Sequence, residues 1–212
     1  AMVQPWDVEQ LSAAARTAAA DSAGGAVPRS TLDEYTQLPS VLRGLGELVG
    51  RVLGITLAMA PAPPSEAWAP GVIRCEASHP DHGFLGTVYM DLCSRPGKYP
   101  SAVTFPIRCG KALPGGSYQA PIMALLADFG HPGCTPEQAC LSMRELRVLV
   151  HEMGHCVHNL ASRTTYQHLW GTRCAQDLVE VPSHLFEHWA SHPASLALLA
   201  RHASTREPMP SA

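Results

Sequence analysis

The residues best suited to chemistry form a short cluster, His151-Glu152-Met153-Gly154-His155, in which the two histidines are four positions apart. On an α-helix, residues at this spacing lie on one face, one turn from each other. Their imidazole nitrogens can then hold a single zinc ion, while the carboxylate of Glu152 accepts a proton from an attacking water. The motif therefore predicts a metal site with a general base, provided that the segment is helical.

A catalytic zinc ion usually has three protein ligands and a water, so the motif needs one more ligand. One class of site uses the longer pattern His-Glu-x-x-His-x-x-Gly-x-x-His, but here Ala161 stands where its third histidine would be. The other class takes a carboxylate from the next helix, and Glu180 is the candidate. Asp177 and Glu187 share its helical face, so either could instead be a ligand or could orient a histidine. His158 is a weaker candidate, because three ligands would crowd one helix.

The motif needs a helix to position it, and the sequence predicts one from about residue 143 to residue 161. Ser142 and Glu145 fit the Ser-x-x-Glu capping box that begins helices. Apolar residues then recur at helical spacing through the motif. They are Met143, Leu146, Leu149, Val150, Met153, Val157 and Leu160. The metal-binding pair therefore falls in the middle of this helix.

The helix that carries Glu180 is predicted from Asp177 to Ala190, after a linker that contains Gly171. Its expected core side consists of Leu178, Val181, Leu185 and Trp189. Pro182 cannot donate a backbone hydrogen bond, so it should lie near the start of the helix or at a kink.

The rest of the chain predicts further helices and a small sheet. Helices are expected in the Ala-rich stretch up to Ala20, after Ser30, from Pro39 to Gly54, and over Ala194–Ala203; residues 60–71 are expected to form a loop. Strands are expected over Val72–Ala77, Phe84–Cys93, Ala102–Arg108 and Pro121–Phe129, with short turn-rich links that favour antiparallel neighbours. The predicted fold class is mainly α with a small, antiparallel-containing β-sheet (α+β).

Composition narrows the class of protein. The 212 residues are 46% hydrophobic with a formal net charge of −3, which suits one globular domain or part of a larger one. No basic run predicts nucleic-acid binding, and no apolar stretch reaches the roughly 20 residues of a membrane helix. The seven cysteines include no Cys-x-x-Cys pair, which argues against a disulfide framework or a cysteine-rich zinc site.

Several segments together closely resemble the M3 family of zinc oligopeptidases, which includes the thimet oligopeptidase and neurolysin group. The resemblance begins at Pro5-Trp6-Asp7 and covers nearly the whole chain. It is carried by the segments 85–92, 95–98, 151–158, 171–174 and 177–183. It implies a zincin-type active-site helix, one Zn²⁺ per chain held by His151, His155 and Glu180, and Glu152 as the general base.

The resemblance also implies a function and a context. Members of this family hydrolyse short peptides, and the segments 171–174 and 180–183 look most like members that trim mitochondrial presequence intermediates, which implies the mitochondrial matrix, or alternatively the cytoplasm or another organelle. Family members are several times longer. Residues 1–212 would then be a partial catalytic domain, without the family's N-terminal helical region and C-terminal segment.

Two functions follow from these expectations. The first is a zinc metalloendopeptidase that acts on short peptide substrates. The second is a catalytically weak or inactive fragment that binds zinc or peptides and acts through a partner chain. The oligomeric state and the peptide specificity stay open.

Overall fold

The computed structural model describes Asp7, Leu11, Ala14 and residues 29–210 of the chain. The predicted Ala-rich helix up to Ala20 lies largely outside the described residues. The elements of the described residues begin with two helices, continue with the strands and end with the remaining helices. In order they are α2 (Arg29–Tyr35), α3 (Leu38–Leu53), β1 (Thr56–Pro61), β2 (Ile73–His79), β3 (Gly83–Cys93), β4 (Val103–Arg108), β5 (Lys111–Ala112), the 3₁₀ turn η2 (Pro114–Gly116), β6 (Tyr118–Gln119), β7 (Ile122–Phe129), α4 (Met143–Ala161), the 3₁₀ turn η3 (Gln167–Leu169), α5 (Gln176–Val179), α6 (Val181–Trp189) and α7 (Pro193–Leu199). The predicted fold class, mainly helical with a small sheet, is confirmed.

The main sheet has five strands in the order β1-β2-β3-β7-β4, with β5 and β6 forming a separate two-stranded hairpin. The pairs β1–β2, β2–β3 and β4–β7 are antiparallel, whereas β3 and β7 are parallel. The expectation that β3 and β4 are neighbours is therefore wrong, because β7 lies between them. The connection through β4 and the β5–β6 hairpin is long enough to make the crossover that a parallel pair requires.

One strand was not expected from the sequence. Thr56–Pro61 forms β1 at the edge of the sheet, where the missing N–H of Pro61 costs no interior hydrogen bond. The opposite edge strand is β4, and its side chains Val103, Phe105 and Ile107 are exposed. The free edge of β4 matters below, because this strand also contacts α4.

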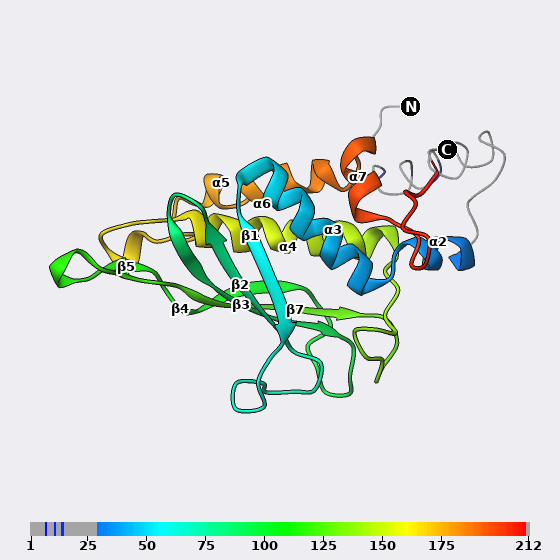
Figure 1. Cartoon of the computed structure of the whole chain (residues 1–212), viewed down its shortest axis with the longest axis horizontal. Helices are drawn as coiled ribbons and strands as arrows, with labels where there is room; N and C mark the ends of the chain where they lie inside the picture. Colours follow the sequence, from blue (N-terminus) through cyan, green and yellow to red (C-terminus); the bar gives the residue numbers. More distant parts are fainter. Residues whose placement is uncertain (1–6, 8–10, 12–13, 15–28, 211–212) are drawn as a thin grey trace.

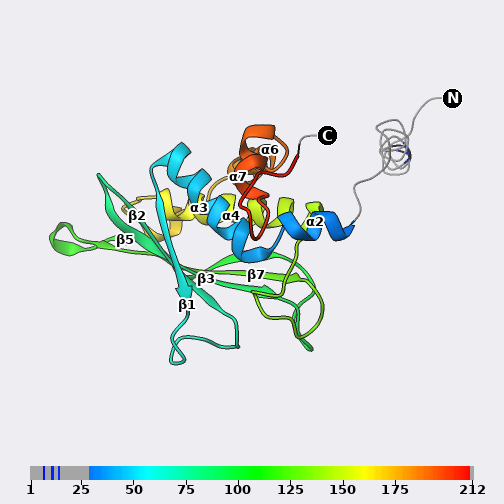
Figure 2. The same cartoon turned by 45° about the vertical axis from the view of Figure 1, so that its right-hand side comes forward.

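Helix α4 lies between the sheet and α6 (Figures 1 and 2). Its predicted bounds are confirmed, and the predicted capping box is present. The Ser142 hydroxyl accepts from the Glu145 backbone N–H at 3.1 Å, and the Glu145 carboxylate accepts from the Ser142 N–H at 2.7 Å. Its apolar side chains are buried at the sheet and under α6. They include Leu146, Leu149, Val150, Met153, Cys156, Val157 and Leu160.

The second predicted helix is divided in two at Glu180, which ends α5 and begins α6. Pro182 lies in the first turn of α6, where its missing N–H has no helical partner to lose. The expected core side is largely wrong, because Leu178, Val181 and Leu185 are about half exposed while Trp189 is partly buried. Ser183 and Phe186 face inward instead, since close packing against α4 selects the face with the small residue.

The last predicted helix is shorter than expected. Helix α7 ends at Leu199, and Arg201 then forms a bridge with Pro208 in place of further helical turns. Helix α7 packs against α3, which in turn contacts β1. These contacts bring α3, near the start of the continuous stretch 29–210, beside α7, near its end.

Candidate metal centre

Helix α4 presents its histidines toward α6. His151 and His155 are partly exposed, whereas Glu152, the residue between them in the motif, is only 7% exposed. The imidazole rings of the two histidines contact edge to face, with 5.0 Å between ring centroids. The helix therefore separates two tasks, with the imidazoles on the α6 side and the carboxylate directed toward the sheet.

Glu180 reaches both histidines from the junction of α5 and α6. Its Oε2 atom lies 3.2 Å from Nε2 of His155 and 3.6 Å from Nε2 of His151. The three residues each offer one ligand atom, and all three atoms lie within 4.8 Å of one another. The structure thus brings together the three residues that the sequence predicts as ligands. Asp177 and His158 do not belong to this group.

The spacing of these atoms fits a small divalent ion. Zinc lies about 2.0–2.1 Å from nitrogen and oxygen ligands in tetrahedral sites, which places neighbouring ligand atoms about 3.3–3.4 Å apart. The two oxygen–nitrogen separations, 3.2 and 3.6 Å, bracket that value. Two imidazoles and one carboxylate are also a donor set typical of catalytic zinc, so the residues present fit the ion.

Close packing between α4 and α6 places Glu180. A Cβ atom added to Gly154 would lie 2.7 Å from the Cα of Ser183 and 2.9 Å from the carbonyl oxygen of Pro182. Only glycine therefore allows α6 to approach α4 this closely. The first turn of α6 then holds its carboxylate beside the helix that carries the histidines.

Ser183 also fixes the orientation of the Glu180 side chain. Its buried hydroxyl donates to Oε2 of Glu180 at 2.7 Å. This hydrogen bond is the main reason that the pKa of Glu180 lies below its usual value; partial burial opposes it, and the nearby histidines add to the lowering. The carboxylate is consequently kept ionised, which is the form that binds a cation.

A second carboxylate orients His151. Oε1 of Glu187 lies 2.6 Å from Nδ1 of His151, and Arg147 donates to Oε2 of Glu187 at 2.7 Å. Since a carboxylate only accepts, the proton is on Nδ1, and the lone pair of Nε2 is directed toward Glu180. Burial raises the pKa of Glu187, but the hydrogen bonds from His151 and Arg147 outweigh it and lower that pKa overall. Glu187 therefore takes the orienting role that the sequence left open.

The other two histidines of α4, His155 and His158, have fewer hydrogen-bond partners than His151. Burial lowers the pKa of His155, against the opposing effect of Glu180, and burial likewise lowers the pKa of His158. The Nδ1 atoms of both residues are buried and have no hydrogen-bond partner among the described residues. Neutral imidazole, the form that binds metals, is therefore favoured at His155.

The proposed base Glu152 contacts a residue that the sequence did not single out. The hydroxyl of Thr104, on β4, donates to Oε2 of Glu152 at 2.8 Å. Thr104 lies in a strand that the sequence predicts. Its distance along the chain from the His-Glu-x-x-His motif gives no sign of a contact, because only the packing of β4 against α4 brings Thr104 to Glu152. Ser183 and Arg147 were also missed, although Ser183 belongs to one of the segments that carry the family resemblance.

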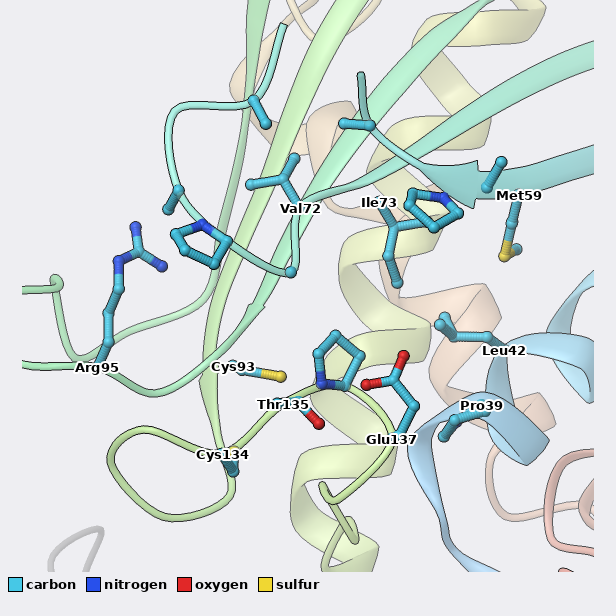
Figure 3. Close-up of a pocket in the computed structure, with 18 of the residues that line it drawn as sticks. Pro39, Leu42, Met59, Val72, Ile73, Cys93, Arg95, Cys134, Thr135 and Glu137 are labelled. Atoms are coloured by element: carbon cyan, nitrogen blue, oxygen red, sulfur yellow. The ribbon is translucent and has the colours of Figure 1, made fainter. Parts of the chain in front are cut away.

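A large cavity lies elsewhere among the described residues. It has a volume of about 1330 Å³ and lies between α3, β1, the 62–72 loop and the 133–137 loop, with Cys93 and Arg95 at its side (Figure 3). None of the predicted site residues lines it. The chemistry of the donor set, and not cavity size, therefore locates the candidate site.

A His-Glu-x-x-His helix with a carboxylate from the next helix, packed on a small mixed sheet, defines the class of zinc-peptidase-like domains. The sequence profile of peptidase family M3 matches residues 2–212. The chain belongs to peptidase family M3.

Two similar proteins are mitochondrial intermediate peptidases. The chain is 40% identical over 210 residues to the mitochondrial intermediate peptidase of Arabidopsis thaliana, covering 99% of this chain and 29% of that protein. It is 35% identical over 213 residues to the mitochondrial intermediate peptidase of Phaeosphaeria nodorum, covering 85% of this chain and 27% of that protein. The chain thus spans less than a third of the length of these relatives. Within the described residues, no helix combines the length and the apolar character needed to cross a membrane.

Proposed function

We propose that this chain carries the metal site of a zinc-dependent metalloendopeptidase that hydrolyses short peptides or presequence intermediates. One observation carries the proposal: His151, His155 and Glu180 converge within 4.8 Å, beside Glu152 on the same helix. Membership of peptidase family M3 and the names of the relatives support peptide substrates. The same names support a mitochondrial location, and we propose the matrix, with the cytoplasm or another organelle as the alternative.

The roles of the residues follow from their contacts. His151, His155 and Glu180 would hold Zn²⁺, which supplies a Lewis acid that polarises a peptide carbonyl and makes water more acidic. Glu152 takes a proton from the attacking water and passes it to the leaving amine. Glu187 keeps His151 in the tautomer with a free Nε2. Ser183 keeps the Glu180 carboxylate aimed between the two imidazoles.

The edge strand β4 supports a binding mode for the peptide. Its outer edge has no partner strand among the described residues, and Thr104 on this strand contacts Glu152 directly. An extended peptide that adds to this edge would place its backbone beside the proposed base. Pro106 limits the pairing, since it has no N–H to donate.

The experiment compares the parent chain with Glu152→Gln. We expect about one equivalent of zinc in both proteins, and cleavage of an internally quenched peptide, sensitive to chelator, in the parent alone. A Gln variant that cleaves as fast as the parent would refute the role of Glu152. A chain that binds no zinc would refute the site itself.

A specific observation favours a second candidate, a zinc- or peptide-binding unit that acts only with further polypeptide. Large apolar side chains on α5 and α6, the two helices that meet at Glu180, are exposed. They are Leu178, Val181 and Leu185. An apolar surface of this kind is typical of a face that another segment or chain covers. Zinc binding without chelator-sensitive cleavage by this chain would favour this second candidate.

A further inference from the structure

The carboxylate of Glu152 is held from the sheet side by a single side chain of β4. The Thr104 hydroxyl lies 2.8 Å from Oε2 of Glu152 and 3.3 Å from the backbone carbonyl oxygen of the same residue. A hydroxyl has one proton, and the nearer, negatively charged oxygen is the stronger acceptor. The hydroxyl therefore donates chiefly to the carboxylate.

A third contact orients this hydroxyl. The Sγ atom of Cys156 lies 3.8 Å from Oγ1 of Thr104, and either atom could be the donor in that contact. Because the hydroxyl proton is directed to Glu152, the thiol is the donor. The contacts form a chain from Cys156 through Thr104 to Glu152, inside the interface of α4 with β4.

We infer that Thr104 is a positioning residue for the general base, which fixes the Glu152 carboxylate at Oε2 and leaves its other oxygen for the proton of the attacking water. This inference rests on the proposed function. Glu152 is 7% exposed, so few water molecules can compete with Thr104 for this oxygen. The free edge of β4 is also the proposed peptide-binding edge. One strand would therefore align both the peptide backbone and the base.

The kinetic test compares Thr104→Val, which keeps the shape and removes the hydroxyl, with Thr104→Ser, which keeps the hydroxyl. We expect Thr104→Val to lower kcat by about tenfold to a hundredfold, less than the full contribution of a general base, which is about 10²–10⁴. KM and zinc affinity should change by less than about twofold, because the hydroxyl contacts neither the metal ligands nor the peptide. Thr104→Ser should restore most of kcat.

Thr87→Val serves as the matched control. Thr87 is a buried threonine on β3, in the same sheet, and no role in the site is proposed for it. Its kcat should equal that of the parent. Equal kcat for Thr104→Val and the parent would overturn the inference. A fall in kcat, zinc affinity and melting temperature together, without rescue by Ser, would also overturn it, since that result indicates a structural role alone.

An infrared measurement gives a readout that does not depend on turnover. The carboxylate stretch of Glu152 is isolated as the difference between the metal-free chain and its Glu152→Gln variant, and the same difference is then taken in the Thr104→Val background. The band should change position when the hydroxyl is removed. If the parent cleaves no peptide, the proposed activity of this chain fails, and this measurement decides the inference: an unmoved band overturns it, and a shifted band retains Thr104 as the group that holds Glu152.

Discussion

Substituting Gly154 by alanine tests how the packing of α4 and α6 builds the metal site. The added Cβ would lie 2.7 Å from Cα of Ser183, 2.9 Å from the Pro182 carbonyl oxygen and 3.1 Å from the Ser183 nitrogen, whereas ordinary contacts begin at 3.4 Å. All three neighbours are backbone atoms, so no side chain can rotate away. Helix α6 must therefore retreat by at least about 0.7 Å, and Glu180 retreats with it.

Gly154→Ala should have a small effect on the free energy of unfolding and a larger effect on zinc affinity. Overpacking costs about 1–3 kcal/mol, and replacing a helical glycine with alanine returns about 1 kcal/mol, so the free energy of unfolding should fall by about 0–2 kcal/mol. The displaced Glu180 carboxylate should weaken zinc binding by about 10- to 100-fold, the range typical of losing a group that supports a ligand. Competition titration with a zinc chelator and denaturant unfolding of the metal-free chain measure the two effects.

Gly46→Ala is the matched control, because Gly46 lies within α3 and a Cβ added there meets no atom within 4 Å. This variant should gain about 1 kcal/mol in unfolding free energy and leave zinc affinity unchanged. If Gly154→Ala behaves like Gly46→Ala in both measurements, the proposed packing does not position Glu180, and the reasoning is refuted.

Three further predictions concern a residue that orients a proposed ligand, a buried ion pair on β3, and the effect of zinc on stability. Glu187→Gln should weaken zinc binding by about 10- to 100-fold in the chelator titration, because the charged partner of His151 is lost; unchanged affinity would show that Glu187 does not orient the ligand. Asp91→Asn should cost about 3–5 kcal/mol in denaturant unfolding, because Asp91 is 3% exposed and Lys98 would remain buried without a counter-charge; a loss under 1 kcal/mol would contradict this. Burial opposes ionisation of Asp91, but hydrogen bonds from Arg95 and Lys98 hold its pKa below the usual value. The stabilisation from the Asp91 carboxylate should therefore be complete above the unfolded pKa of about 3.9 and be lost as pH falls through the lower folded pKa. A pH series of unfolding curves should show this loss in the parent and not in Asp91→Asn. Zinc at about 100 times its Kd should raise the free energy of unfolding by about 2.7 kcal/mol, and chelator should remove this gain.

Local sequence patterns predicted the central helix well. The capping box at Ser142 and the repeat of apolar residues fix both ends of α4, because these signals act within one or two turns of the chain. The same locality explains why the histidine pair and its neighbour Glu152 were found together. Four of the five strands in the main sheet were also predicted from short runs of residues.

Long-range packing accounts for what the sequence did not reveal. Local turns suggested that β3 and β4 are neighbours, but the order of strands depends on β7 entering between them. In α6, helical periodicity favoured the face of Val181 and Leu185, whereas the close contact at Gly154 turns Ser183 inward. Thr104 was missed for the same reason, since its contact with Glu152 joins a strand to a helix far along the chain.

Zinc K-edge X-ray absorption of the chain loaded with one equivalent of zinc tests the central claim most directly. The proposed ligands His151, His155 and Glu180 predict two imidazoles and light oxygen donors at about 2.0–2.2 Å, and Glu180→Ala should change the oxygen shell while keeping both imidazoles. Sulfur at about 2.3 Å, or a spectrum that Glu180→Ala leaves unchanged, would contradict the account, because zinc would then be held by one of the seven cysteines or by other groups.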